Sequence, residues 1–321
     1  MSDVLSVFEL MAHIQPKLAN LPATQARRLL HGRGACFAGW QHLNIDYYAG
    51  VVLLTWFAEP TDEQALQEAL ITAFAQQATA LLTGIASQHR HIRPASTHAL
   101  WGEVPDKLVA REGELQFWVD MKRQNSGLFM DMAPGRQWLL DHAAGKQLLN
   151  TFAFTCSLSV AAIAGGAQRV VNIDMNGGVL NRGRENQALN NQQSADVEYL
   201  PYKVLKSINK LERKGPFDLL IADPPTFQRG SFEFDKDYGR LLRRLPRLLA
   251  TEATLLLCCN SPRVTEAEFR KLITDSLPEA EFVERLPSNE DFVEQGEAPL
   301  KVLMYRYSAN PEAKQIALSV G

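Results

Sequence analysis

Residues 146–174 read KQLLNTFAFTCSLSVAAIAGGAQRVVNID, the stretch that decides the fold. Two short apolar runs, KQLLN (146–150) and RVVNID (169–174), flank a helix-length segment at 156–165. Near-continuous apolar strands joined by a helix are typical of parallel strands buried on both faces. The stretch therefore predicts a β-α-β unit of a parallel sheet.

The same alternation continues toward the C-terminus. Further strands are predicted at 197–200, 217–222 and 253–259, and helices at 177–190, 203–213, 236–250 and 264–275. EFVERL (281–286) and LKVLMYRY (300–307) then form two strands with no helical periodicity between them. The sequence predicts an α/β fold whose parallel sheet ends in an antiparallel pair.

A different pattern precedes residue 121. We expect a helix within 1–30, a loop at HGRGACFAGW (31–40), and a hairpin in 42–57 that turns at Ala49-Gly50. Thr61 and Gln64 predict a capping box at the start of a helix, and strands are expected at 99–103 and 115–121. Three parts follow from this pattern: an N-terminal helical segment (1–30), a small α+β domain in β-β-α-β-β order (31–120), and the α/β domain (121–321).

Composition sets broad limits on location and partners. Hydrophobic residues make up 46%, charged residues 21%, and the formal net charge is −3, so bulk charge neither supports nor excludes a nucleic-acid partner. The four cysteines form no C-x-x-C pair, so neither a disulfide framework nor a zinc site is indicated, and no metal is expected. We find no apolar run of membrane-spanning length and no basic leader, and we expect a cytoplasmic protein.

Polar residues stand where the first two predicted strands end, and ligands bind at the carboxyl ends of parallel strands. Asn150 closes the first strand, and the turn behind it lacks the G-x-G-x-x-G that a dinucleotide requires. Asp174 closes the second strand, where a carboxylate can accept both hydroxyls of a ribose. These features favour a nucleoside without phosphate groups as the ligand. A plain loop at 151–157 and a helix N-cap role for Asp174 are the alternatives.

Two later strand ends carry candidate catalytic residues. Asp223-Pro224-Pro225-Thr226-Phe227 follows the strand at 217–222, and its two prolines hold the backbone rigidly. Hydrogen-bond acceptors beside an aromatic side chain suit a planar, nitrogen-rich ligand. Its edge would be hydrogen-bonded while its face stacks on Phe227. Asn260, which follows Cys258-Cys259, is predicted to line the same pocket. A rigid structural turn and a purely apolar role for both cysteines are the alternatives.

Together these residues resemble the bacterial large-subunit rRNA base methyltransferases, whose members make 5-methylcytosine and 7-methylguanine. The resemblance rests on NSGLFMD (125–131), LNTFAFT (149–155), Asp174 and DPPTF (223–227), and covers about residues 115–307. It implies a Rossmann-like class I methyltransferase sheet behind a small α+β domain, with S-adenosyl-L-methionine as cofactor. HGRGACFAGW resembles the opening segment of a less characterised branch, and no PUA domain is recognised.

The resemblance also implies roles for single residues. Cofactor contacts are expected from Phe129, Asp131, Asn150, Phe152, Thr155, Asp174, Lys203 and Asp223. Catalytic roles are expected for Asp223, Pro224, Pro225, Phe227 and Asn260.

Departures from the family pattern qualify these assignments. Cys156 stands where the family often has glycine, Ala133 where it has arginine, and Lys203 where an acid often meets the adenine amine. The 5-methylcytosine members carry a cysteine where this chain has Asn260, and the 7-methylguanine members carry asparagine there. Attack by a nitrogen atom of the base is therefore favoured.

An RNA partner, and large-subunit rRNA in particular, is the expectation that the resemblance adds. Arg240, Arg243, Arg244 and Arg247 are predicted to share one face of a helix and to meet phosphates, with a simple solvated face as the alternative. His89, Arg90, His91 and Arg93 form a further candidate contact. A methyltransferase acting on a protein or small molecule, and a non-catalytic RNA-binding factor, are the rival functions. The oligomeric state is open, with a homodimer as one alternative.

Overall fold

The computed structural model describes residues 5–309. Contacts divide the chain into two units. The smaller unit comprises Met1–Ala133 and Asn289–Ala298, and the larger comprises Pro134–Ser288 and Pro299–Gly321. The units therefore divide near residue 133, and a short segment late in the chain belongs to the N-terminal unit.

The larger unit contains a seven-stranded sheet in the order β10-β9-β8-β11-β14-β16-β15. Its strands are β8 (Gln147–Thr151), β9 (Arg169–Ile173), β10 (Val197–Leu200), β11 (Phe217–Ala222), β14 (Leu249–Asn260), β15 (Ala280–Arg285) and β16 (Leu300–Ser308). The pairs from β10 to β14 are parallel, whereas β16 is antiparallel to both β14 and β15. The predicted α/β sheet with a closing antiparallel pair is confirmed.

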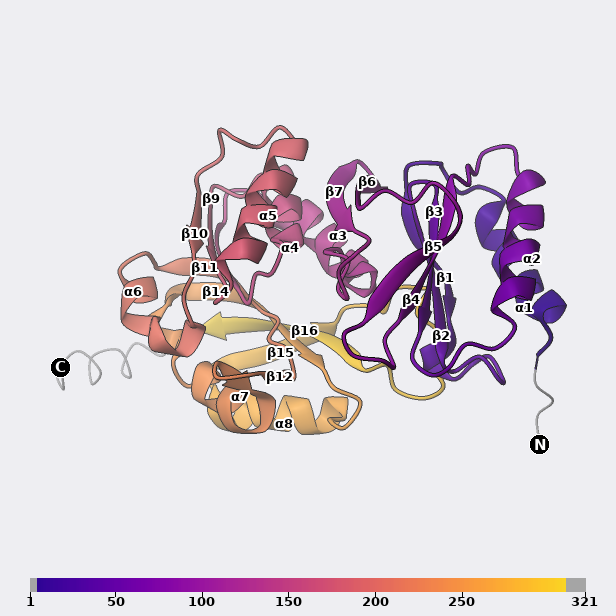
Figure 1. Cartoon of the computed structure of the whole chain (residues 1–321). Coiled ribbons are helices and arrows are strands. Elements are labelled where there is room, and N and C mark those ends of the chain that lie inside the picture. Colours follow the sequence, from indigo (N-terminus) through magenta and orange to yellow (C-terminus); the bar gives the residue numbers. More distant parts are fainter. Residues whose placement is uncertain (1–4, 310–321) are drawn as a thin grey trace. The chain divides into compact units, whose positions relative to one another are not determined.

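Helices cover both faces of this sheet. They are α3 (Ala133–His142), α4 (Ser157–Ala164), α5 (Gly177–Leu189), α6 (Ile208–Glu212), α7 (Phe234–Leu242) and α8 (Glu266–Ser276). Figure 1 shows α4 and α5 on one side of the sheet and α7 and α8 on the other. Apolar residues from β11, β14, α7 and α8 form the largest buried cluster, with Tyr238 of α7 packed edge-on against Phe269 of α8.

Two predicted helices of this unit were wrong in extent. The helix expected at 236–250 ends at Leu242, and a 3-10 turn at Leu245–Arg247 leads directly into β14. Pro246 lies within that turn, lacks an N–H donor and disfavours helical backbone at the residue before it. The helix expected at 203–213 is split into a 3-10 turn at Val204–Lys206 and the short α6. Helix α3 was not predicted.

The smaller unit is an α+β structure whose sheet has the order β1-β2-β3-β4-β5. Its elements are α1 (Val7–Leu18), β1 (Ala26–His31), β2 (Leu43–Tyr48), β3 (Val51–Trp56), α2 (Glu63–Ala75), β4 (Gly84–His89) and β5 (Ser96–Gly102). Strands β3 and β4 are parallel and connected through α2, which packs beside α1 (Figure 1). A separate hairpin follows, β6 (Lys107–Glu112) with β7 (Leu115–Asp120).

Several predictions for this unit need correction. The expected helix over 1–30 ends at Leu18, and Leu29 and Leu30 lie instead in the buried part of β1. The N-cap residue of α2 is Asp62, which has a left-handed backbone and makes no capping hydrogen bond with its side chain. The prediction of a capping box formed by Thr61 and Gln64 was therefore wrong. Strands β1, β4 and β6 were not predicted. The hairpin turning at Ala49-Gly50 is confirmed.

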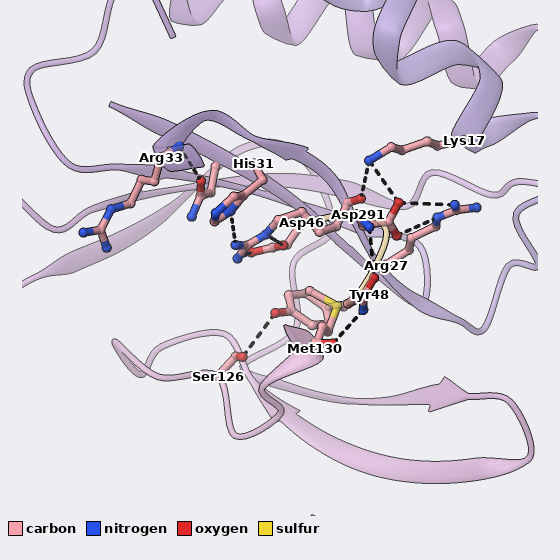
Figure 2. A network of polar contacts seen from close by, with 12 residues as sticks. Lys17, Arg27, His31, Arg33, Asp46, Tyr48, Ser126, Met130 and Asp291 are labelled. Atoms are coloured by element: carbon pink, nitrogen blue, oxygen red, sulfur yellow. Dashed lines mark hydrogen bonds and ion pairs between the residues drawn. The ribbon is translucent and has the colours of Figure 1, made fainter. Parts of the chain in front are cut away.

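The segment 289–298 leaves the larger unit's sheet between β15 and β16 and packs within the smaller unit. Figure 2 shows Asp291 of this segment within reach of Lys17 and Arg27, at 3.0 and 2.8 Å. A side chain at Gly34 would meet the carbonyl oxygen of Val293 at 1.8 Å. The second glycine of the HGRG sequence is therefore required by close contact with this segment.

None of the helices in the part of the chain that the structure describes combines the length and apolar character that crossing a membrane requires.

Candidate active site

The sheet order brings four informative strand ends to one edge. Strand β8 pairs with β9 on one side and with β11 on the other, and β11 pairs with β14, all in parallel. Asn150 therefore lies opposite Asn172, next to the end of β9, and Ala222 lies opposite Leu257 near the end of β14. The residues that follow these strands gather at the carboxyl edge of the sheet, where ligands bind in open α/β folds.

The turn after β8 has an unusual backbone. Phe152, Phe154 and Cys156 all have left-handed conformations, with φ of 57°, 48° and 58°. Non-glycine residues in this region cost on the order of 1–3 kcal/mol each and persist where surrounding contacts hold them, often at functional sites. Here the turn is held by Ala153 N–H, which donates to the Ile173 carbonyl at 3.1 Å, and by Asn186, which donates to the Thr155 carbonyl at 3.0 Å.

Asp174 closes β9 and faces this turn. Its carboxylate accepts hydrogen bonds from the backbone N–H groups of Phe154, at 3.1 Å, and Asn176, at 2.9 Å. The residue is only 5% exposed, and burial raises the pKa of its carboxyl, while the two backbone bonds act in the opposite direction. An ionised carboxylate offers about four acceptor positions, so further donors can be accommodated.

Asn150 lies deeper than the sequence suggested. Its amide donates to Ser159 Oγ at 2.9 Å and to Asn172 Oδ1 at 3.2 Å, in a buried network between β8, β9 and α4. Asn150 Oδ1 is buried and has no hydrogen-bond partner in the protein. Such an atom is costly to leave unpaired.

The double-proline sequence forms a rigid corner connected to β14. Thr226 donates its hydroxyl hydrogen bond to the Asn260 carbonyl at 2.8 Å, which holds the corner beside the end of β14. Pro224 is buried, Pro225 is exposed, and Phe227 is 67% exposed. An aromatic ring this accessible, beside the polar Asp223 and Asn260, is a suitable stacking surface for a planar ligand.

A small flap follows the corner, formed by β12 (Phe227–Gln228), β13 (Phe232–Glu233) and the turn between them. Phe232 packs edge-on against Phe152 of the β8 turn, with ring centroids 5.0 Å apart. Lys203, after β10, donates to the Gly230 carbonyl of the flap at 2.7 Å. The flap thus connects the ends of β8 and β10, and its two-residue strands had no signal in the sequence.

The other expected residues have different surroundings. Phe129 and Asp131 belong to the smaller unit. Lys203 directs its ammonium group to the flap rather than to an acid. Thr155 is buried, and its carbonyl is bound by Asn186.

The four arginines do not share one helical face, because α7 ends at Leu242. Each makes contacts within its own unit: Arg240 with Asp237, Arg243 with Ser276, Arg244 with the Leu205 carbonyl, and Arg247 with Glu212 and Asn209. The prediction of a single arginine stripe was wrong.

Comparison with known proteins identifies the class. A family model described as S-adenosylmethionine-dependent methyltransferase matches residues 27–306, and the chain belongs to this family. The Rossmann-like sheet, the turn without phosphate-binding glycines and the buried Asp174 agree with this membership. The chain is therefore an S-adenosylmethionine-dependent methyltransferase, as the sequence predicted.

Several particular proteins are similar to this chain. Ribosomal RNA large subunit methyltransferase I of Aeromonas hydrophila is 26% identical over 79% of this chain and 67% of that protein. Ribosomal RNA large subunit methyltransferase K/L of Hahella chejuensis is 30% identical over 68% of this chain, but this match spans only 32% of that protein. The crystal structure of SMU.776 complexed with SAH superimposes with a TM-score of 0.81 at 23% identity, covering 95% of this chain and 83% of that one.

Proposed function

We propose that this enzyme methylates a base of large-subunit ribosomal RNA, with a ring or exocyclic nitrogen as the acceptor atom. The observation that carries the proposal is the convergence of Asp174, the rigid Asp223 corner and the exposed ring of Phe227 at one edge of the sheet. The relatives named as large-subunit rRNA methyltransferases support the choice of RNA.

The residues at the ends of β8 and β9 fit the cofactor. Asp174 is the proposed acceptor for the ribose hydroxyls, because it is buried and its two backbone bonds leave acceptor positions unused. The turn from Phe152 to Cys156, which contains three left-handed residues, completes the proposed cradle. When bound, S-adenosylmethionine supplies a methyl group made electrophilic by its sulfonium centre.

The corner after β11 is the proposed site for the target base. Phe227 would stack on the face of the base, while Asp223, the Pro224 carbonyl and Asn260 would hold its edge. Pro225 keeps the backbone of this corner fixed, so the acceptor atom is positioned before reaction. Positioning of this kind can contribute up to about 7–11 kcal/mol to lowering a barrier.

The buried cysteines favour nitrogen as the acceptor atom. Attack at a pyrimidine carbon would need an accessible thiolate to activate the ring. Cys258 and Cys259 are fully buried in β14, and burial raises the pKa of the Cys156 thiol, which is also buried. The three cysteines of the larger unit are thus all buried. A nitrogen lone pair needs no such nucleophile.

RNA phosphates need cationic partners, and we propose two sets. Arg240, Arg243, Arg244 and Arg247 remain candidates as separate contacts, because the side chains of Arg240 and Arg247 stay about half exposed. In the smaller unit, Arg33 and Arg90 both lie over the ring of Phe57, at 4.4 and 5.4 Å from its centroid. Burial and the charge of Arg33 lower the pKa of Arg90, as expected where cations are close together.

The test is transfer of a tritiated methyl group to rRNA from a strain in which the gene is deleted. We expect wild-type enzyme to label large-subunit rRNA, and Asp223→Asn to lower the rate at least about 100-fold, the usual contribution of a positioned polar group at the reacting atom. Phe227→Ala should also lose transfer but should keep the binding of S-adenosylhomocysteine.

Asp141→Asn is the matched control, since Asp141 is an exposed acid on α3 whose carboxylate accepts hydrogen bonds from Gln137. Labelling of protein or of a small metabolite instead of RNA would overturn the substrate assignment. Equal rates for Asp223→Asn and Asp141→Asn would overturn the role of the corner.

A further inference from the structure

Three residues with metal-binding side chains meet at one end of the smaller unit's sheet. Glu63 is the first residue of α2, His89 ends β4, and His98 lies in β5. One ligand atom from each lies within 4.8 Å of the other two. The proposed methyltransferase residues at the ends of β8, β9 and β11 take no part in this cluster, so it needs an explanation of its own.

The sheet register explains why the three residues meet. Ser87 lies opposite His98 in the β4–β5 pair, and His89 lies two residues beyond Ser87. Side chains two residues apart along a strand share a face, so both histidines project from the same side of the sheet. The rings of His89 and His98 accordingly make an edge-to-face contact, with centroids 5.0 Å apart.

Glu63 reaches the histidines from α2. Its Oε1 lies 3.6 Å from His89 Nε2 and accepts a hydrogen bond of 2.5 Å from the buried Ser87 hydroxyl. The Ser87 oxygen also lies 3.0 Å from His89 Nε2. Ser87 therefore holds the carboxylate of Glu63 and the imidazole of His89 close to one another.

We propose that Glu63, His89 and His98 bind a divalent transition-metal ion, with zinc as the best match. Two imidazoles and one carboxylate form a recognised zinc donor set that leaves a fourth position for water. Calcium and magnesium prefer oxygen ligands alone. His91, whose ring centroid is 5.4 Å from that of His89, is close enough to supply the fourth ligand.

The geometry requires only a small adjustment. Ligand atoms about 2.1 Å from a tetrahedral zinc lie roughly 3.4 Å apart, close to the separation of Glu63 Oε1 and His89 Nε2. His98 is exposed, and its ligand atom lies within 4.8 Å of the other two. Zinc at His89 Nε2 would replace the contact with Ser87, whose hydroxyl would still donate its hydrogen bond to Glu63.

The experiment is calorimetric titration of zinc chloride into the full chain, freed of any histidine tag and treated with EDTA. We expect one zinc per chain, with the affinity lowered at least about 10-fold in both Glu63→Gln and His98→Ala, since even indirect partners of metal ligands contribute that much. Glu63→Gln keeps an oxygen for the Ser87 hydroxyl, so its fold is expected to be intact if His98→Ala is destabilised.

His13→Ala is the matched control, because His13 is an exposed histidine of α1 whose ring contacts Phe37 instead of the cluster. Saturable binding that persists unchanged in Glu63→Gln, or that disappears in Cys36→Ser, would overturn the assignment, as would the absence of saturable binding in wild type. Thermal melts in EDTA check the fold of each variant. Failure here leaves the methyltransferase assignment untouched, because no step of the test depends on methyl transfer.

Discussion

His31 of β1 makes two side-chain hydrogen bonds, one to the segment 289–298 and one within its own strand. Its Nε2 lies 2.9 Å from Glu294 Oε1, and its Nδ1 lies 2.8 Å from a guanidinium nitrogen of Arg28. Burial lowers the pKa of His31 to about 3, assisted by the charges of Arg28, Arg33 and Lys17. The ring is therefore neutral: Nε2–H donates to Glu294 and Nδ1 accepts from Arg28, so the contact with Glu294 is a hydrogen bond rather than an ion pair.

This neutral histidine predicts acid sensitivity of the smaller unit. A histidine whose pKa is lower in the folded state contributes stability above its unfolded pKa of about 6.5, and this contribution is lost as pH falls from there toward 3. The free energy of unfolding falls by up to about 1.4 kcal/mol per pH unit for the one proton that His31 takes up.

We expect His31→Gln to reduce this pH dependence, because glutamine can donate to Glu294 and accept from Arg28 without titrating. Urea unfolding of both proteins at pH 7.5 and 5.0 measures the effect. Identical pH slopes for wild type and His31→Gln would contradict the neutral assignment.

Single residues at strand ends were the most predictable part of the site. Asp174, Asp223 and Asn260 could be placed because parallel strands all end at the same edge of a sheet. Asn150 was placed correctly on β8, but its amide is used within a buried network, which depends on Asn172 and Ser159 from other elements. The Glu63, His89 and His98 cluster was missed, since a search for cysteine spacing cannot detect ligands that three elements bring together.

Close packing between α5 and the turn after β8 depends on one glycine. A side chain at Gly183 would place its Cβ 2.4 Å from Cys156 Sγ and 2.9 Å from Cys156 Cβ. The Cys156 thiol therefore occupies space that Gly183 leaves open. The two positions are expected to be coupled.

We predict that Gly183→Ala destabilises the wild type by about 1–3 kcal/mol, the usual cost of overpacking. In a Cys156→Gly background the same change should be neutral or stabilising, because alanine is favoured over glycine within a helix by about 1 kcal/mol. Chemical denaturation of the four proteins completes a double-mutant cycle. Additive effects of the two changes would show that the residues are not in contact.

Elements with clear periodicity were predicted, and those shaped by distant contacts were not. The strands from β8 to β16 in the main sheet were recognised from their apolar runs. Leu29 and Leu30 fit a helical pattern as well as a strand pattern, so the prediction of a helix at β1 was wrong. Pairing with β2 makes this segment a strand. The flap strands contain two residues each, too few for any period to be detected.

Assignment of residues 289–298 to the smaller unit could not be read from the sequence. These residues follow β15 directly along the chain, yet their acidic side chains pair with Lys17 and Arg27, more than 250 positions earlier (Figure 2). The contact is tight at Gly34, whose position admits no side chain against Val293.

We therefore predict that Gly34→Ala releases this segment and destabilises the smaller unit by about 1–3 kcal/mol. Limited digestion with a glutamate-specific protease should then cut after Glu290, Glu294 or Glu297 faster than in wild type. Gly177→Ala is the control, because a side chain there meets nothing nearer than 3.5 Å. Equal cleavage rates in both variants would contradict the proposed contact.

The account as a whole depends on a nucleoside site between the ends of β8 and β9. Calorimetric titration with S-adenosylhomocysteine tests it most directly, using wild type, Asp174→Ala and Phe227→Ala. We predict one site per chain in wild type, unchanged in Phe227→Ala, and weaker by at least about 10-fold in Asp174→Ala, since hydrogen bonds to a charged group contribute about 1.5–3 kcal/mol. Binding that is absent from the wild type, or equally tight in Asp174→Ala, would contradict the account.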